Sequence, residues 1–468
     1  MTPVTCFAGK TVALFGLGGS GIATAHALKA GGAQVIVWDD NAPARARAGI
    51  DGLNVGDLDK QDWSRMSSLI LSPGIPLTHP KPHWTVERAR AAGVEVIGDL
   101  ELFCRERADI APDAPFIAIT GTNGKSTTTA LTAHILREAG VDVQLGGNIG
   151  TPILALEPPS RERMHVIEVS SFQIDLAPSL NPTVGALINL SPDHLDRHGT
   201  MENYAAVKAR LIDGSERALV GIDDEYCWRI GRERETRHVS SGRMTCPVSV
   251  TRELPHGVYA LGTEIISTLH DQDAVILGDT RGISTLRGAH NVQNAAFAAG
   301  IVHMWQFQPD VIARGLRSYP GLPHRMEEVG RLGKVLFIND SKATNADATE
   351  KALLSFRDIF WIAGGQMKEG GIRPLMPLMD RVRKAYLIGA AANDFSQTLG
   401  KDVPHAICGT LEAALIAAAL DAQASVSREP VVLLSPACAS YDQFANYEAR
   451  GDAFRKYVAS LTSDEVQP

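Results

Sequence analysis

The residues best suited to chemistry lie in one short stretch, Gly121-Thr-Asn-Gly-Lys-Ser126. An apolar run at 116–119 precedes it, and apolar residues at helical spacing follow it as far as Gly140. A strand that leads through a glycine turn into a helix gathers backbone N–H groups and the helix dipole around an anion. We therefore expect a phosphate-binding loop, in which Lys125 reaches the β- and γ-phosphates of a nucleotide and the Ser126 hydroxyl holds Mg²⁺.

This stretch departs from the full P-loop pattern, because the position of the first glycine in that pattern is occupied by Ile119. The alternative is an ordinary strand–turn–helix junction that carries a surface lysine. We favour the phosphate loop, because strand, turn and helix follow one another in the order that phosphate binding requires.

A second glycine-rich stretch, Gly16-Leu-Gly-Gly-Ser-Gly21, lies between an apolar run and a helical pattern at 22–30. A strand at 35–38 follows and ends in Asp39 and Asp40, so the whole segment matches the dinucleotide-binding fingerprint. Alone it would indicate an NAD-dependent dehydrogenase. The fingerprint requires only a diphosphate and a ribose hydroxyl, however, and UDP presents both.

Polar residues follow several later strands. Asn148 is the polar centre of a glycine-rich loop, and Glu168 lies at the C-terminal end of a predicted strand at 164–169. The carboxyl ends of strands in an α/β sheet face the ligand crevice, so Glu168 is a candidate Mg²⁺ ligand. The alternative is a solvated glutamate.

His194 and His198 follow the predicted strand at 184–189. Their spacing suggests zinc, but no third soft ligand is evident, and a second Mg²⁺ suits the acidic surroundings better. Lys208 lies in a helical pattern at 202–212 and by itself reads as a lysine that faces solvent.

Composition sets the broad class. The 468 residues exceed what one hydrophobic core holds, and strands alternate with helical patterns throughout. We expect an α/β protein of three domains: a Rossmann-like domain at 1–110, a central P-loop-type domain with a mostly parallel sheet at 111–321, and a second Rossmann-like domain at 322–468. Short strand-like runs at 235–290 read as a hairpin-rich appendage of the central domain.

Charge and cysteine usage narrow the partners. The net charge of −8 argues against nucleic acid, and no apolar run approaches the roughly 20 residues that span a bilayer. The first residues lack a signal-peptide pattern, and the six cysteines form no C-x-x-C pair. A cytoplasmic protein without membrane insertion is expected.

Two phosphate-binding loops imply two nucleotide-type ligands, and the second loop carries the equipment for phosphoryl transfer. Polar loops at the strand ends of the third domain suit a small polar substrate. One ATP, one nucleotide-linked substrate and one small molecule together indicate a ligase.

Several motifs at this point resemble the Mur ligases of peptidoglycan synthesis. They are 119–126, 168–171, 193–196, Lys208, 290–294 and 321–325. Two further motifs, 337–345 and 434–444, resemble the branch of that family that adds D-glutamate to UDP-N-acetylmuramoyl-L-alanine.

The resemblance implies that ATP phosphorylates the carboxylate of the UDP-linked substrate and that the D-glutamate amine then attacks the acyl phosphate. It also implies a monomer that acts in cell-wall precursor synthesis, and hence in cell shape, cell division and the cell cycle. The cofactors would be ATP and two Mg²⁺ ions.

Site residues carry over by position. The resemblance makes Lys125, Asn148, His194 and Lys208 catalytic, with Mg²⁺ held by Ser126, Glu168, His194 and a carbamylated Lys208. ATP would contact Gly121, Thr122, Asn123, Gly124, Lys125, Ser126, Thr127, Asn294, Arg325 and Asp340. The UDP substrate would contact Gly16, Gly18, Ser20, Gly21, Asp40, Ser72 and Gly74. D-Glutamate would contact Thr344, Lys368, Ser440, Tyr441 and Tyr447.

One departure concerns Asp40 and Asn41, which replace the hydroxyl and arginine that some relatives carry there. Asp40 cannot therefore be a phosphate ligand. Asn291 and Asn294 either read an adenine edge or cap their helix.

The alternatives are another amide ligase of the superfamily, either a sister Mur ligase or a folylpolyglutamate synthetase, and more remotely a dehydrogenase. The UDP-type domain disfavours the folate enzyme, and the last two motifs disfavour the sister ligases. A dehydrogenase would leave residues 121–126 and the third domain without a role. A binding or scaffold role gives no reason for Lys125, Glu168 and His194 together.

Overall fold

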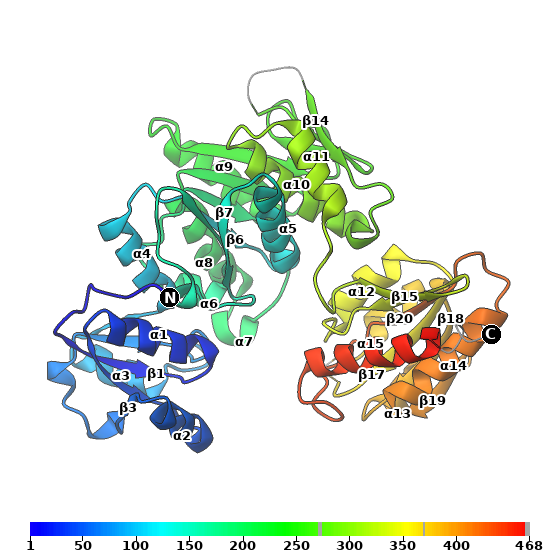
Figure 1. Ribbon diagram of the computed structural model, residues 1–468, viewed down its shortest axis with the longest axis horizontal. Coiled ribbons are helices and arrows are strands. Elements are labelled where there is room, and N and C mark those ends of the chain that lie inside the picture. Colours follow the sequence, from blue (N-terminus) through cyan, green and yellow to red (C-terminus); the bar gives the residue numbers. More distant parts are fainter. Residues whose placement is uncertain (270–273, 368–369, 464–468) are drawn as a thin grey trace. The chain divides into compact units, whose positions relative to one another are not determined.

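The computed structural model describes residues 1–269, 274–367 and 370–463. The fold is α/β, with three mostly parallel sheets, as the sequence predicts (Figure 1). The chain forms two compact units: one joins Met1–Thr280 to Val292–Ser318, and the other joins Arg281–Asn291 to the chain from Tyr319 onward. Among the described residues, none of the helices is long and apolar enough to cross a membrane.

The first sheet has five strands in the order β3-β2-β1-β4-β5, all paired in parallel. The strands are β1 (Thr11–Phe15), β2 (Gln34–Trp38), β3 (Asn54–Val55), β4 (Ser68–Leu71) and β5 (Glu95–Ile97). The helices are α1 (Gly19–Ala30), α2 (Ala42–Ile50), α3 (Trp84–Ala91) and α4 (Asp99–Ile110). β4 is buried along its whole length, as expected for a parallel strand covered on both faces.

The second sheet has nine strands in the order β14-β13-β12-β11-β10-β9-β6-β8-β7. They are β6 (Phe116–Thr120), β7 (Asp142–Gly147), β8 (Arg163–Glu168), β9 (Val184–Leu187), β10 (Arg217–Gly221), β11 (Met244–Ser249), β12 (Val258–Leu261), β13 (Glu264–Ser267) and β14 (Val275–Asp279). The helices are α5 (Lys125–Glu138), α6 (Ser171–Asp175), α7 (Leu195–His198), α8 (Met201–Gly214), α9 (Glu225–His238), α10 (Ala289–His303) and α11 (Pro309–Ser318).

The segment 235–290, expected as a hairpin-rich appendage of the central domain, joins the central sheet itself. β11 pairs in parallel with β10, and β12, β13 and β14 continue outward from β11. The hairpins therefore extend the central sheet. Local turn signals mark such strands but do not say which edge they join.

The third sheet has six strands in the order β15-β16-β20-β17-β18-β19. They are β15 (Glu327–Leu332), β16 (Val335–Asn339), β17 (Ile359–Gly364), β18 (Val382–Ile388), β19 (His405–Gly409) and β20 (Val431–Leu434), with α12 (Ala346–Ser355), α13 (Ala392–Leu399), α14 (Leu411–Ala424) and α15 (Tyr447–Ser463). Leu336 and Ile338 pack with α12 and α13, while Val335 and Phe337 pack with α14 and α15. Alternate residues thus fill cores on opposite faces.

Each predicted domain range contains one sheet, at 11–97, 116–279 and 327–434. The boundaries at 110 and 321 themselves stay predictions. One continuous apolar cluster includes Val12 and Val35 of the first sheet together with Phe116 and Leu187 of the second. The first two sheets therefore share a core within one compact unit.

Candidate active site

The loop at 121–124 joins β6 directly to α5, so the predicted strand–turn–helix junction is present. Gly124 precedes α5 with φ +83°, a left-handed conformation that favours glycine. A Cβ atom at this position would lie 2.1 Å from Asn294 Oδ1. Asn294 comes from α10, and its Oδ1 also accepts a hydrogen bond from Thr128 Oγ1 at 3.3 Å. The fold thus brings Asn294 against the loop to which the sequence assigned ATP.

Lys125 lies over this loop. Its Nζ donates hydrogen bonds to Gly121 O at 3.0 Å and to Thr122 O at 2.7 Å. The Thr122 and Ser126 side chains are buried, and Asn123 N donates to Asn189 Oδ1 at 2.9 Å. Contacts with the central sheet therefore hold the loop in place. The Lys125 ammonium group lies at the N-terminus of α5, where a phosphate would be bound.

Glu168 ends β8 beside this loop, since Ile119 of β6 pairs with Glu168. Its Oε1 accepts a hydrogen bond from Asn148 Nδ2 at 2.8 Å. Its Oε2 is buried and has no hydrogen-bond partner within the described residues. A buried carboxylate oxygen without a donor is costly, and a bound cation would remove that cost.

Lys208 is only 1% exposed, so the expectation of a lysine that faces solvent is wrong. Its Nζ donates to Thr120 Oγ1 at 2.9 Å and to Gly121 O at 2.8 Å, and lies 5.0 Å from the Tyr204 ring centroid. Burial, followed by the nearby Lys125 charge, lowers the pKa of Lys208 well below its usual value. The sequence carried a signal for this, because residues 204, 205, 208, 211 and 212 form one helical face.

The two histidines of the 191–198 segment have different surroundings. His194 precedes α7 with φ +53°, and its Nε2 lies 3.4 Å from Asp193 Oδ2. Burial, with smaller contributions from Lys125 and Lys208, lowers the pKa of His194. His198 is buried and stacks on Phe172, with 5.3 Å between ring centroids. Its Nε2 lies 2.9 Å from Ser171 Oγ, so its ring is held in the interior, whereas the His194 side chain is 47% exposed.

In the dinucleotide-binding fingerprint of the first sheet, neighbouring segments lie so close together that a side chain larger than glycine would not fit at two positions. A Cβ atom at Gly16 would lie 2.6 Å from Ser72 Cβ, and one at Gly21 would lie 1.8 Å from Gly16 O. Ser72 Oγ donates to Gly16 O at 2.8 Å, and Ser20 Oγ donates to Asp99 Oδ2 at 2.5 Å. Gly16, Ser20, Gly21 and Ser72 are thus brought together at the ends of β1 and β4.

Asp40 and Gly74 lie at neighbouring loops. Asp40 is exposed, with Oδ2 3.4 Å from His83 Nε2. Gly74 O accepts a hydrogen bond from Arg197 Nη1 at 2.8 Å. The adjacent Asp39 is the structural member of the pair, since its carboxylate accepts hydrogen bonds from Leu17 N at 2.6 Å and Asn41 N at 2.8 Å.

Sequence reasoning missed Arg197 and Phe172. The Arg197 guanidinium lies 4.5 Å from the Phe172 ring centroid, and both residues line a small cavity with Pro73 and Thr78. The cavity lies between the first sheet and the central sheet of the same unit. Arg197 directly follows the 193–196 motif, but nothing local showed that its guanidinium reaches the loop after β4.

In the other compact unit, Asp340 follows β16 and is buried. Its Oδ1 accepts from Met326 N at 3.2 Å, and its Oδ2 accepts from Ser435 Oγ at 2.9 Å. Burial raises the pKa of Asp340 to about 7. Arg325, the next predicted ATP residue, adds only a smaller opposing effect on that pKa.

The predicted D-glutamate residues lie in this unit. Thr344 and Ser440 follow β16 and β20, which are neighbours in the sheet, and the Tyr447 ring centroid lies 3.8 Å from Lys342 Nζ. Tyr441 is 71% exposed. Lys368 lies outside the described residues. Sequence reasoning missed the buried Arg450, whose guanidinium donates to Ser341 O at 2.8 Å and Cys438 O at 3.0 Å and so joins the two loops.

Comparison with known families agrees with these elements. The model of the "Mur ligase middle domain" matches residues 119–302, and that of the "Mur ligase MurD-like, N-terminal domain" matches residues 10–98.

Curated relatives align over nearly the whole chain. The UDP-N-acetylmuramoylalanine–D-glutamate ligase of Nitrobacter winogradskyi is 60% identical over 98% of each chain. The enzyme of the same name from Mesorhizobium japonicum is 57% identical over 100% of this chain and 99% of its own.

Solved structures show the same fold at low identity. A pseudomurein peptide ligase type C from Methanothermus fervidus gives a TM-score of 0.57 at 18% identity, over 97% of this chain and 100% of its own. UDP-N-acetylmuramate-alanine ligase MurC from Thermotoga maritima gives 0.56 at 18% identity, over 97% of this chain and 99% of its own.

Proposed function

The chain belongs to the Mur ligase family, and on that premise we propose that it joins D-glutamate to UDP-N-acetylmuramoyl-L-alanine with consumption of ATP, in peptidoglycan precursor synthesis. The observation that carries this proposal is the 57–60% identity, along essentially the full chain, with relatives that bear that name. Elements for two nucleotide-type ligands in the first compact unit agree with it.

The reaction brings two anions together. The substrate carboxylate attacks the γ-phosphorus of ATP, ADP leaves, and an acyl phosphate forms. The amine of D-glutamate then attacks the acyl carbon, and the tetrahedral intermediate expels phosphate and loses a proton. Because a carboxylate must approach a negatively charged phosphate, the site has to supply concentrated positive charge.

Lys125 supplies part of that charge. Its ammonium group already lies on the carbonyls of the 121–124 loop, at the N-terminus of α5. We assign it, with Gly121 to Thr127, to the phosphates of ATP. Asn294, packed against Gly124, is assigned to the same nucleotide, and Arg325 and Asp340 are its expected contacts in the other unit.

Glu168 and Ser126 are the assigned ligands of one Mg²⁺. The buried Oε2 of Glu168, which accepts no hydrogen bond from the described part of the chain, fits a cation. Asn148 holds the other carboxylate oxygen and so orients the group. When bound, Mg²⁺ would neutralise charge on the transferred phosphoryl group.

Lys208 and His194 are assigned to a second Mg²⁺, with Lys208 carbamylated. Among the described residues no carboxylate lies within ion-pair distance of Lys208, and its amine is buried against a hydroxyl and a carbonyl. An uncharged amine can attack CO₂, forming an N–C bond and releasing a proton. The product is an anionic ligand in place of a buried cation.

The remaining assignments follow the family positions. The loops after β1 and β4, with Gly16, Gly18, Ser20, Gly21, Ser72 and Gly74, are assigned to UDP together with Asp40, which follows β2. Thr344, Lys368, Ser440, Tyr441 and Tyr447 are assigned to D-glutamate. We propose a cytoplasmic monomer.

Phosphate release with UDP-N-acetylmuramoyl-L-alanine and ATP tests the proposal. Release is expected with D-glutamate, and not with L-glutamate or with the amino acids used by sister ligases. Lys125→Ala serves as the control for contaminating ATPase activity. Release driven by a different amino acid, or tight NAD binding without any release, would overturn the assignment.

A further inference from the structure

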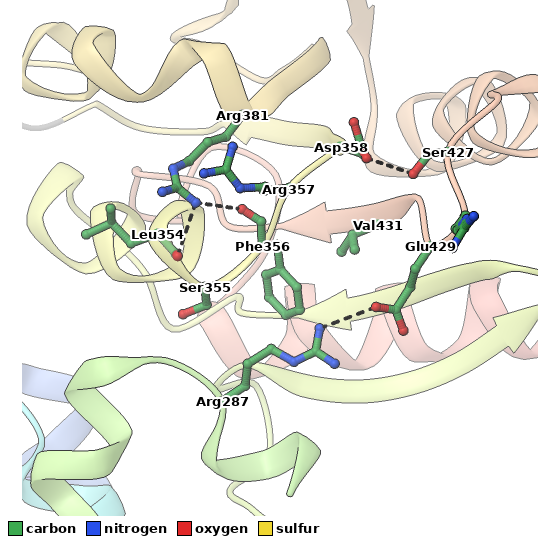
Figure 2. A pocket seen from close by; sticks show the side chains of 11 residues that line it. Arg287, Leu354, Ser355, Phe356, Arg357, Asp358, Arg381, Ser427, Glu429 and Val431 are labelled. Atoms are coloured by element: carbon green, nitrogen blue, oxygen red, sulfur yellow. Dashed lines mark hydrogen bonds and ion pairs between the residues drawn. The ribbon is translucent and has the colours of Figure 1, made fainter. Parts of the chain in front are cut away.

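A cleft in the second compact unit, apart from every residue assigned above, contains four arginines (Figure 2). They are Arg287, Arg357, Arg381 and Arg428. The cleft encloses about 540 Å³, which lies within the usual range of small-ligand sites. The rest of its wall comes from the end of α12, the segment between α12 and β17, the segment before β20 and the first residue of β20.

The cleft lies at the amino-terminal ends of β17, β18 and β20, whereas the assigned site lies at the carboxyl ends of the strands. Val431 lines it and begins β20, whereas Ser435, which binds Asp340, follows the last residue of that strand. At about 3.3 Å per residue, the two positions are about 13 Å apart. A ligand in the cleft would not overlap the residues assigned to ATP or D-glutamate.

Two of the arginines are fixed in place. Arg381 Nη1 donates to Leu354 O at 3.3 Å and to Phe356 O at 3.1 Å, the carbonyls at the end of α12 (Figure 2). The Arg287 guanidinium lies 5.0 Å from the Phe356 ring centroid, and its Nη1 lies 3.8 Å from Glu429 Oε2. Because these contacts already order the Arg287 and Arg381 side chains, binding of an anion costs them little further conformational entropy.

The charge in the cleft is in excess. Its carboxylates, Asp358 and Glu429, each bind an arginine that does not line it: Arg383 pairs with Asp358, and Arg331 Nη2 lies 3.3 Å from Glu429 Oε1. Arg357 and Arg428 are exposed and have no hydrogen bond or ion pair to any described residue. The cleft is therefore a positive patch on a chain of net charge −8, and such a patch attracts anionic ligands.

We propose that this cleft binds a small organic phosphate carrying at least two negative charges. Guanidinium groups match phosphate oxygens in geometry and charge. Leu354, which is 46% exposed, offers an apolar surface for the organic part. A concave site of this size suits a small molecule, and the acidic chain as a whole disfavours nucleic acid.

Hydrogen exchange measured by mass spectrometry tests the proposal, because it locates each binding event on the chain. The probe is inorganic pyrophosphate at about 1 mM in about 0.15 M NaCl, added to the full chain. We expect exchange to slow by about threefold or more in peptides that cover 281–291, 354–358 and 427–431. Slowing in 121–126 reports the separate phosphate loop and serves as an internal comparison.

The variant Arg357→Ala/Arg428→Ala removes the two unpaired arginines and leaves the fixed ones. It should lose the slowing at the cleft and keep it at 121–126. The control Arg65→Ala/Arg317→Ala removes the same charge from exposed positions in the other unit and should keep both.

Three outcomes would overturn the proposal. The first is an unchanged cleft in the wild-type chain, and the second is slowing that survives in the Arg357→Ala/Arg428→Ala variant. The third is slowing reproduced by NaCl at matched ionic strength, or seen with phosphatidylglycerol vesicles and absent with pyrophosphate. None of these depends on ligase activity, so the proposed function is tested separately.

Discussion

Two ionisable residues in this chain lie in places where a charge is costly. Glu168 has one carboxylate oxygen without a donor, and Lys208 has a buried amine without a carboxylate within ion-pair distance, among the described residues. Each would be destabilising alone. Their common position beside the 121–124 loop makes a shared cationic cofactor and a modified lysine a consistent explanation for both.

Replacing Lys208 with methionine separates chemistry from packing. Lys208→Met shortens the side chain by one heavy atom and removes the buried amine, so stability should change by no more than about 2 kcal/mol in either direction. Turnover should fall by about 100-fold or more, because the proposed anionic ligand is lost. Phosphate release and urea unfolding measure the two effects. The exposed Lys29 of α1 provides the control, Lys29→Met. Near-normal turnover in Lys208→Met would exclude the assigned role.

Asp340 makes stability depend on pH. Its pKa is raised to about 7 by burial, so the folded chain holds a proton at pH values where the unfolded chain has lost it. Its contribution is therefore fully present below the unfolded pKa of about 3.9 and is lost as pH rises toward 7. The stability of wild type relative to Asp340→Asn should fall by about 2 kcal/mol between about pH 5.5 and 8.

Urea unfolding at several pH values measures this difference. Asp394→Asn, an exposed carboxylate of α13 in the same unit, is the matched control and should show no such trend. A difference that stays constant with pH, or that grows in favour of wild type at high pH, would contradict the burial argument for Asp340.

At the scale of elements, the sequence predicted what local patterns determine. Two features could be predicted in this way: the β6–loop–α5 junction and the fingerprint of the first sheet. In each, turn glycines lie within a few residues of apolar residues at strand or helix spacing. The burial of Lys208 depended on α8 packing against the sheet, although the helical face at 204–212 indicated it. The joining of β11 to β10, and the reach of Arg450 to the loops after β16 and β20, depend on contacts between distant segments. No local pattern encodes them.

The two glycines that flank α5 test the close approach at the loop. Both have left-handed backbone angles, with φ +83° at Gly124 and +81° at Gly140, but a Cβ atom would meet Asn294 Oδ1 only at Gly124. Gly140→Ala should cost about 1–2 kcal/mol from backbone strain alone. Gly124→Ala should cost about 1–3 kcal/mol more from overpacking, and should weaken ATP binding.

The same comparison in an Asn294→Ala background isolates that contact. Removing Oδ1 should bring the two glycine variants closer together, as a double-mutant cycle of urea unfolding would measure. If the cost of Gly124→Ala is unchanged there, the approach of α10 is not its cause.

At the scale of the whole molecule, the first two sheets share one apolar cluster, while the third sheet belongs to a separate compact unit. The sequence predicted three domains from motifs, and motifs carry no information about which cores merge. Side chains of α4 contribute to the merging: the buried Glu101 accepts hydrogen bonds from Ser179 N at 2.9 Å and Ser179 Oγ at 2.8 Å. We therefore expect the elements assigned to UDP and to the phosphates of ATP to unfold together.

UDP should reveal this coupling. Two compact units predict two calorimetric transitions, which Leu131→Ala and Leu353→Ala identify, because each truncates a fully buried leucine in one unit at a cost of about 2–5 kcal/mol. UDP at about 100 times its dissociation constant should stabilise only the transition lowered by Leu131→Ala, by about 2.7 kcal/mol. Leu131 belongs to α5, which packs on the second sheet, whereas the UDP loops belong to the first sheet. The transition that Leu131→Ala lowers therefore responds to UDP only if the first two sheets unfold together. If a third transition appears and UDP raises it alone, the shared core is too weak to join them. If UDP raises the transition marked by Leu353→Ala, the assignment of UDP to the first sheet is wrong.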